Sequence, residues 1–118
     1  MSDLYAKLAA LLGPKGHTTD ATTIAPHLKE WRGRYQGNTP FLAIPANTEE
    51  VAALVRLCAQ AGAAITTQGG NTGLVGGQIP QGEVLLSTTR MNRIRAIDAG
   101  NDSLIAEAGV VLAAVQQA

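Results

Sequence analysis

QGGNTGLVGG, at residues 68–77, is the most informative segment of this 118-residue chain. Five of its ten residues are glycine, and the segments on either side have the composition of β-strands. Because glycine has no Cβ, the backbone N–H groups of such a run can turn inward and approach an anion closely. The segment therefore predicts a loop that binds phosphate.

The segments before this loop have the pattern of a strand, a helix and a second strand. Residues 41–44 and 63–67 are the predicted strands, and Pro45 ends the first because proline cannot donate to a β-ladder. Strand, helix and strand over this length predict a βαβ unit with parallel strands and a right-handed crossover. Ligands of such sheets bind beyond the carboxyl ends of the strands, which is where the glycine loop begins.

The helix between the two strands has a clear start and end. Asn47 is its predicted N-cap, Glu50 is the capping-box partner, and Gly62 follows its last turn. The apolar residues of one face follow i, i+3, i+4, i+7 spacing and are Val51, Leu54, Val55 and Cys58. Cys58 is therefore expected in the core and not as a nucleophile.

The rest of the chain completes a mixed α/β (α+β) architecture. An N-terminal helix is predicted over residues 2–12, followed by a polar surface connection over residues 16–26. Beyond the loop, residues 83–87 predict a third strand, and residues 93–107 predict a hairpin before a final helix that starts near residue 110. The predicted fold is a small parallel βαβ sheet with flanking helices, followed by the start of an antiparallel sheet.

Composition excludes several classes of protein. Nine basic and nine acidic residues balance, so neither a nucleic-acid partner nor a charged tail is expected. A single cysteine excludes an internal disulfide and favours a reducing compartment. No segment has the pattern of a signal peptide or is long and apolar enough to span a membrane, so a cytoplasmic location is expected.

Two common phosphate loops do not match residues 68–77. No Gly-Lys-Ser/Thr follows, as Walker A requires, and Gly70, Gly73 and Gly76 lack the spacing of the dinucleotide-binding fingerprint. A long glycine turn that merely connects two strands is the open alternative, although plain connections rarely need so many residues.

The loop resembles the first pyrophosphate-binding loop of the FAD-linked oxidase family, which includes vanillyl-alcohol oxidase and p-cresol methylhydroxylase. Pro45 with residues 48–51, Ser87 with residues 90–94, and residues 107–110 stand where that family has similar motifs. EWRGRYQG, at residues 30–37, resembles the segment before the FAD domain in the branch of D-2-hydroxyglutarate and D-lactate dehydrogenases.

The resemblance implies an N-terminal helical extension over residues 1–37 and the first part of an FAD-binding domain over residues 38–118. It implies cofactor contacts at Gln68, Gly69, Gly70, Asn71, Thr72, Gly73, Leu74, Gly76, Gly77, Pro45, Ser87 and Asn92. Gly70 and Gly73 are predicted either to adopt conformations that a Cβ would disfavour or to face the pyrophosphate. FAD is expected to bind noncovalently, because residues 68–78 contain no His, Cys or Tyr that could attach it.

Two departures from the family pattern limit what the resemblance implies. Thr67 stands where that branch usually has proline. The family's FAD domain is also about twice as long, and its catalytic and metal-binding histidines would follow Ala118. No catalytic residue and no metal ligand is therefore assigned. The resemblance implies the FAD-binding portion of an enzyme that oxidises a small D-2-hydroxy acid, with that substrate bound only in a full-length protein. A truncated, non-catalytic fragment is the alternative.

The remaining polar and aromatic candidates are assigned no chemistry. His17 and His27 lack a cysteine or carboxylate partner, so a metal site is not expected. Trp31 is expected to pack, although its neighbours Arg32 and Arg34 leave an anion-facing role open. The other arginines, Arg90, Arg93 and Arg95, are expected to form a solvated edge. An uncovered hairpin leaves strand edges exposed, and these favour self-association.

Overall fold

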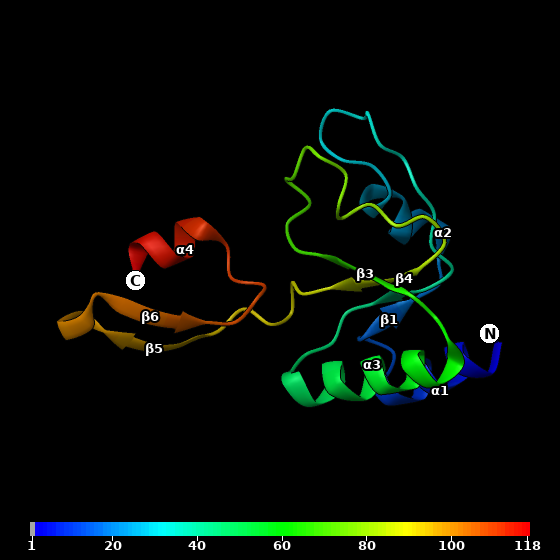
Figure 1. The fold of residues 1–118 in the computed structure, drawn as a ribbon, viewed down its shortest axis with the longest axis horizontal. Helices are drawn as coiled ribbons and strands as arrows, with labels where there is room; N and C mark the ends of the chain where they lie inside the picture. Colours follow the sequence, from blue (N-terminus) through cyan, green and yellow to red (C-terminus); the bar gives the residue numbers. More distant parts are fainter. Residues whose placement is uncertain (1) are drawn as a thin grey trace.

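The computed structural model describes residues 2–118 and confirms the predicted mixed α/β fold. A four-stranded sheet lies at the centre, with α1 and α3 side by side along one face and α2 on the opposite side (Figure 1). In chain order the elements are α1 (Ser2–Leu12), β1 (His17–Thr18), α2 (Ala21–Ile24), the 3-10 helix η1 (Ala25–His27), β2 (Leu42–Ala43), α3 (Thr48–Ala61), β3 (Ile65–Gln68), β4 (Val84–Ser87), β5 (Ile94–Asp98), the 3-10 helix η2 (Ala99–Asn101), β6 (Ser103–Ala106) and α4 (Leu112–Gln117).

The strand order of the sheet is β1-β2-β4-β3. β4 runs parallel to both β2 and β3, so the predicted parallel arrangement is confirmed, with β4 inserted between the two strands of the βαβ unit. The short edge strand β1 is antiparallel to β2. Because the parallel strands all end at the same edge, the loop that follows β3 and the turn that follows β4 emerge next to each other.

Alternate residues of the central strands supply two apolar clusters, one on each face of the sheet. Leu86 packs with α1 and α3, whereas its neighbour Leu85 packs with Leu42 and with Ile24 of α2. This alternation follows from the period of two in a β-strand. The residues of the larger cluster are Leu4, Leu8, Leu12, Phe41, Ala43, Leu54, Cys58, Val84 and Leu86.

α3 begins and ends as the sequence predicts, but one residue of the predicted buried face is exposed and another residue takes its place. The side chain of Asn47 accepts a hydrogen bond from the N–H of Glu50 (2.8 Å), and Gly62 has φ of +70°. Cys58 is buried, as expected. Val55, however, is 46% exposed, and Leu57 packs partly against the core in its place. The reason is the position of α1, because the side of α3 that packs against α1 is the side that becomes buried.

The segment of residues 16–26 is more than the predicted surface connection. His17 and Thr18 form β1, and residues 21–24 form α2, which buries Ile24 against the sheet. The side chain of Asp20 caps α2 by accepting a hydrogen bond from the N–H of Thr23 (3.0 Å). These elements are too short for a periodic pattern in the sequence.

β5, η2, β6 and α4 form an arm that projects away from the sheet (Figure 1). The arm, residues 93–118, gives the molecule its longest dimension of 50 Å. The hairpin is confirmed, with an irregularity in register between Ile94 and Ala96. α4 begins at Leu112, slightly later than predicted. Within residues 2–118, no helix combines the length and apolarity that crossing a membrane requires.

Candidate functional site

The glycine loop leaves the carboxyl end of β3, and side-chain amides hold its shape. Gln68 is buried, and its Nε2 donates to the carbonyl oxygens of His27 (2.9 Å) and Gln78 (3.1 Å). Nε2 of Gln78 donates in turn to the carbonyl oxygen of Gly73 (2.7 Å) and to Oδ1 of Asn71 (3.1 Å). These hydrogen bonds link the two ends of the loop, Gln68 and Gln78, to each other, and they link Gln78 to Asn71 and Gly73 in its middle.

Asn71 fixes the loop to the segment that follows α2. Its Nδ2 donates to the carbonyl oxygens of Lys29 (2.9 Å) and Pro26 (3.3 Å). The residue has φ of +58°, a left-handed conformation that asparagine tolerates better than most residues with a Cβ. The loop therefore packs against a segment more than 40 residues earlier in the chain.

The backbone N–H groups of the loop remain free. Across the described residues 2–118, no N–H between Gly69 and Gln78 donates a hydrogen bond to another residue. The loop's carbonyl oxygens and side chains supply its internal bonds instead. Because unpaired N–H groups next to a cavity are available to an anion, the loop has the donors that a phosphate cradle requires.

Of the two alternatives predicted for Gly70 and Gly73, the structure does not show an unusual backbone conformation at either residue. Neither has positive φ, and open space surrounds the Cβ position of Gly70. At Gly73 a Cβ would lie 3.1 Å from Oε1 of Gln78. Gly76 is the loop glycine with positive φ (+86°), and a Cβ there would lie 2.9 Å from the ring of Tyr35. That Gly70 and Gly73 face a pyrophosphate stays a prediction.

Two hollows flank Gly69 and Gly70. The first, which we call the His27 hollow, has a volume of about 520 Å³, and its lining includes His27, Lys29, Gly69, Gly70 and Asn71. The second, the Val110 hollow, has a volume of about 350 Å³, and its lining includes Gly69, Gly70, Thr72, Gly109 and Val110. The two glycines thus lie between two hollows, and the His27 hollow also has the charged side chains of Lys29 and Glu30 in its lining.

The structure places the predicted cofactor-binding residues in different environments. Gly69, Gly70, Asn71 and Thr72 line the hollows, and Asn92 lines a third hollow with Gly109 and Val110. Leu74 lies in the exposed outer part of the loop, with 37% of its surface accessible. The cofactor contacts of all predicted residues stay predictions.

Three predicted residues are buried, and two of them have their side chains engaged within the protein. Pro45 and Ser87 are each almost fully buried, and Oγ of Ser87 lies 3.0 Å from Oγ1 of Thr89. Gln68 uses its amide to hold the loop. Their side chains therefore support the structure around the hollows.

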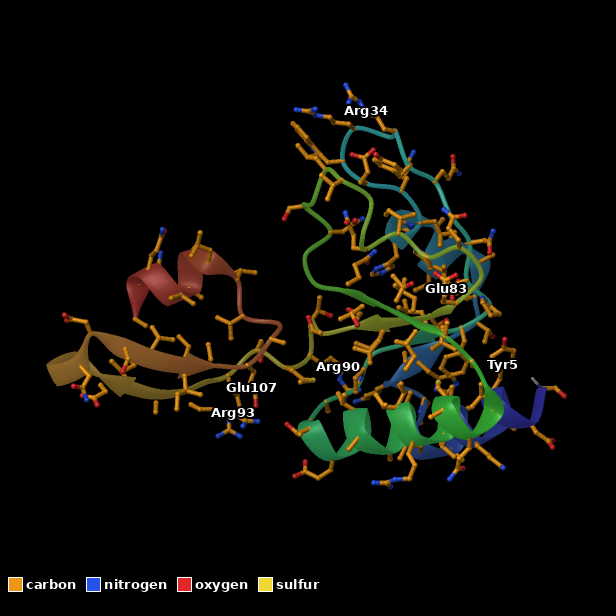
Figure 2. All side chains as sticks on the ribbon, in the orientation of Figure 1. Tyr5, Arg34, Glu83, Arg90, Arg93 and Glu107 are labelled. Carbon is orange, nitrogen blue, oxygen red and sulfur yellow. The ribbon has the colours of Figure 1, made fainter. Side chains whose placement is uncertain are left out.

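The segment of residues 30–37 forms a loop around one buried carboxylate. Glu30 accepts hydrogen bonds from the N–H groups of Arg32 (2.8 Å), Arg34 and Tyr35 (3.3 Å). Burial raises the pKa of Glu30, but these three hydrogen bonds outweigh it, and the pKa lies below its usual value. The loop turns Arg34 outward (Figure 2). Trp31 is 84% exposed, so the expectation that it packs is wrong.

Arg90, Arg93 and Arg95 are exposed, as the predicted solvated edge implies, and the side chains of Arg90 and Arg95 also contact other residues. Nη1 of Arg90 donates to the carbonyl oxygen of Ile44 (2.9 Å), and Arg95 forms an ion pair with Glu107 (3.0 Å). Figure 2 shows Arg90 at the junction of the arm with the sheet, and Glu107 and Arg93 at the base of the hairpin. These contacts hold the base of the arm.

The sequence pattern of the family described as "FAD binding domain" matches residues 39–118. The chain belongs to this FAD-binding-domain family. FAD is accordingly the cofactor of the domain, and the predicted resemblance to FAD-linked oxidases is confirmed. The free N–H groups of the glycine loop fit the phosphate part of this cofactor, since both hollows reach Gly69 and Gly70.

Two curated relatives are similar to this FAD-binding domain along most of its length. "Probable D-2-hydroxyglutarate dehydrogenase, mitochondrial" of Oryza sativa subsp. indica is 37% identical over 112 residues, covering 94% of this chain and 20% of the rice protein. "D-2-hydroxyglutarate dehydrogenase, mitochondrial" of Bos taurus is 37% identical over 100 residues, covering 84% of this chain and 18% of the bovine protein. The chain therefore spans about a fifth of the length of these relatives.

The fold of the domain is that of the p-cresol methylhydroxylase type. The crystal structure of p-cresol methylhydroxylase with substrate bound matches 98% of this chain with a TM-score of 0.86 and 24% sequence identity. The match covers 24% of that protein. The predicted boundary at residue 37 stays a prediction; α1 and β1, from before it, pack with α3 and β2, from after it.

His27 and Lys29 were not predicted as site residues. No motif marks them, and His27 lies 41 residues before the glutamine that it contacts. The only relevant signal in the sequence was their position next to the EWRGRYQG segment.

Proposed function

We propose that this domain holds FAD through the backbone N–H groups of residues 69–78, within a flavin-dependent oxidoreductase that oxidises a D-2-hydroxy acid to the 2-oxo acid. The observation that carries the proposal is the set of loop N–H groups without an acceptor in the chain, next to open space at Gly69 and Gly70. In such a site the loop dipoles replace the hydration of the pyrophosphate without reorganising.

The residues of the domain would bind and orient the cofactor. Gln68 and Gln78 keep the loop open, and Asn71 fixes its position relative to residues 26–29. The Val110 hollow opens on the other side of the glycine pair. Bound FAD supplies the hydride acceptor of the reaction.

The substrate class is proposed from the relatives. Both named relatives are D-2-hydroxyglutarate dehydrogenases, and the similarity includes the glycine loop. No residue of 2–118 is assigned a catalytic role. A 2-hydroxy acid would therefore be bound with residues outside this chain, and the protein carrying this domain should lose its flavin absorbance when D-2-hydroxyglutarate or D-lactate is added without oxygen.

The test of cofactor binding is titration of the purified chain with FAD, followed by flavin fluorescence. Gly73→Val should weaken binding at least about tenfold, because the new side chain would displace the Gln78 amide that holds the loop. Gly100→Val, in the arm, is the matched control and should bind FAD normally. A chain that stays colourless and binds no FAD would favour a non-catalytic fragment instead.

Binding is proposed to be noncovalent. Acid precipitation should then release all the flavin, because residues 68–78 contain no His, Cys or Tyr that could attach it. Flavin that remains on a peptide from this segment would contradict the proposal.

We also propose a cytoplasmic location. The support is the buried free thiol of Cys58, which suits a reducing compartment. The names of the rice and bovine relatives place those proteins in mitochondria. Cell fractionation, with detection of the chain in the soluble or the mitochondrial fraction, decides between the two locations.

A further inference from the structure

His27 is held in one tautomer by the buried amide of Gln68. Nε2 of Gln68 donates to the carbonyl oxygens of His27 and Gln78, which can only accept, so the orientation of the amide is fixed. Its Oε1 therefore faces Nδ1 of His27 at 2.7 Å. Since an amide oxygen can only accept, Nδ1 must carry a proton.

The other ring nitrogen of His27 is free and accessible. Nε2 has no hydrogen-bond partner among residues 2–118, and no buried side-chain nitrogen or oxygen of these residues lacks a partner. Nε2 is therefore open to solvent. His27 is half-buried and lines the hollow that also contains Gly69 and Gly70.

The proton on Nδ1 determines how Nε2 behaves toward an anion. In neutral His27, Nε2 carries a lone pair and can only accept, so it would repel a phosphate oxygen. When His27 is protonated, Nε2 becomes a charged donor, and charge-assisted hydrogen bonds to phosphate are the strong ones. A single proton on Nε2 thus changes the contact of the ring with an anion from unfavourable to favourable.

We propose that His27 is a phosphate-binding residue of the flavin site, and that its protonation makes FAD binding tighter at lower pH. This inference rests on the proposed function. The other ionisable residues that line the His27 hollow are Lys29 and Glu30. Backbone hydrogen bonds outweigh burial and lower the pKa of Glu30, which favours its ionised form. Of these three types of side chain, histidine is the one that ordinarily acts as a switch near physiological pH.

The first measurement is the affinity of the 118-residue chain for FAD between pH 8 and pH 5.5. We expect binding about tenfold tighter at pH 5.5, as one charge-assisted hydrogen bond would give. Riboflavin, which has no phosphate, should show no such change. His27→Asn keeps an amide donor for Gln68 but cannot titrate, and it should remove the pH dependence. His17→Asn is the matched control, since Nδ1 of His17 donates elsewhere, to the carbonyl oxygen of Gly13 (2.7 Å).

The second measurement needs no variant. Nitrogen-15 NMR of the wild-type histidines should show neutral His27 with its proton on Nδ1, and added FAD should shift the Nε2 signal together with the amides of Gly69 and Gly70. A neutral ring protonated on Nε2 would overturn the inference. So would FAD that moves the loop amides but leaves His27 unaffected, although the proposed function would stand. If no loop amide responds to FAD at any pH, both fail.

Discussion

The main body of the molecule, residues 2–92, and the arm, residues 93–118, are stabilised in different ways. In the body, Leu8, Leu54 and Leu85 are fully buried between the sheet and its helices. In the arm no residue is fully buried, and Ile97 and Leu112 are 58% and 70% exposed. Burial of apolar surface is the dominant favourable contribution to folding. The body therefore has a core of its own, whereas hydrogen bonds between neighbouring strands and the contacts at its base hold the arm.

The arm approaches the body closely at Gly109, and Arg95 of the arm also donates a hydrogen bond to Oγ1 of Thr48 in α3 (3.4 Å). The N–H of Gly109 donates to the carbonyl oxygen of Met91 (2.7 Å), and Oγ1 of Thr88 donates to that of Ala108 (3.3 Å). A Cβ at position 109 would overlap the carbonyl oxygen of Thr88, so only glycine fits. This contact also forms one side of the Val110 hollow, and the proposed flavin site therefore combines the body with the weakly buried arm.

Leucine truncation in each region is the strongest test of this contrast. Leu54→Ala should lower the free energy of unfolding by about 2–5 kcal/mol, because it leaves a cavity in the core. Leu112→Ala, in the exposed arm, should change it by less than about 0.5 kcal/mol. Urea unfolding followed by circular dichroism measures both. Equal losses would show that the arm shares the core of the body.

The next largest effect is expected from replacing exposed apolar residues of the arm, which should reduce self-association. Ile97 and Ile105 lie on the hairpin, 58% and 60% exposed, and we expect them to drive self-association through strand edges. Replacing both with threonine, which keeps the preference for strands, should shift sedimentation velocity profiles toward the monomer at high concentration. Val55→Thr, on exposed α3 surface, is the control. Concentration-independent sedimentation of the wild-type chain would contradict this prediction.

Local patterns in the sequence predicted the helices and strands of the body, but they did not predict how these elements pack together. Asn47 and Gly62 mark the ends of α3 through their own chemistry, and that chemistry is visible in one sequence. The position of β4 between β2 and β3 could not be predicted, because strand order depends on packing between distant segments. The same reason explains the error at Val55, whose exposure depends on where α1 lies.

The candidate site also has a part that the sequence predicted and a part that it did not. The glycine loop could be predicted because its composition is unusual within a few residues. His27 could not, because only the folded chain brings it to Gln68. Trp31 was wrongly expected to pack. Nothing in the sequence shows that the Glu30 carboxylate accepts hydrogen bonds from N–H groups of its own loop, in which the indole of Trp31 is exposed.

The smallest expected effect is the pH-dependent stabilisation of the base of the hairpin by Glu107. The N–H of Arg93 and then the guanidinium of Arg95 lower the pKa of Glu107, more than burial raises it. A carboxyl with a lowered pKa stabilises the folded state above its unfolded pKa of about 4.3, and loses that contribution as the pH falls through its folded pKa. Glu107→Gln should therefore reduce hydrogen-exchange protection of the Arg93 amide at pH 7, by less than about tenfold because the guanidinium of the pair is exposed to solvent. The difference should vanish near pH 3, and amides of α3 should be unaffected at either pH. If α3 loses protection to the same extent, the arm and the body unfold as one unit.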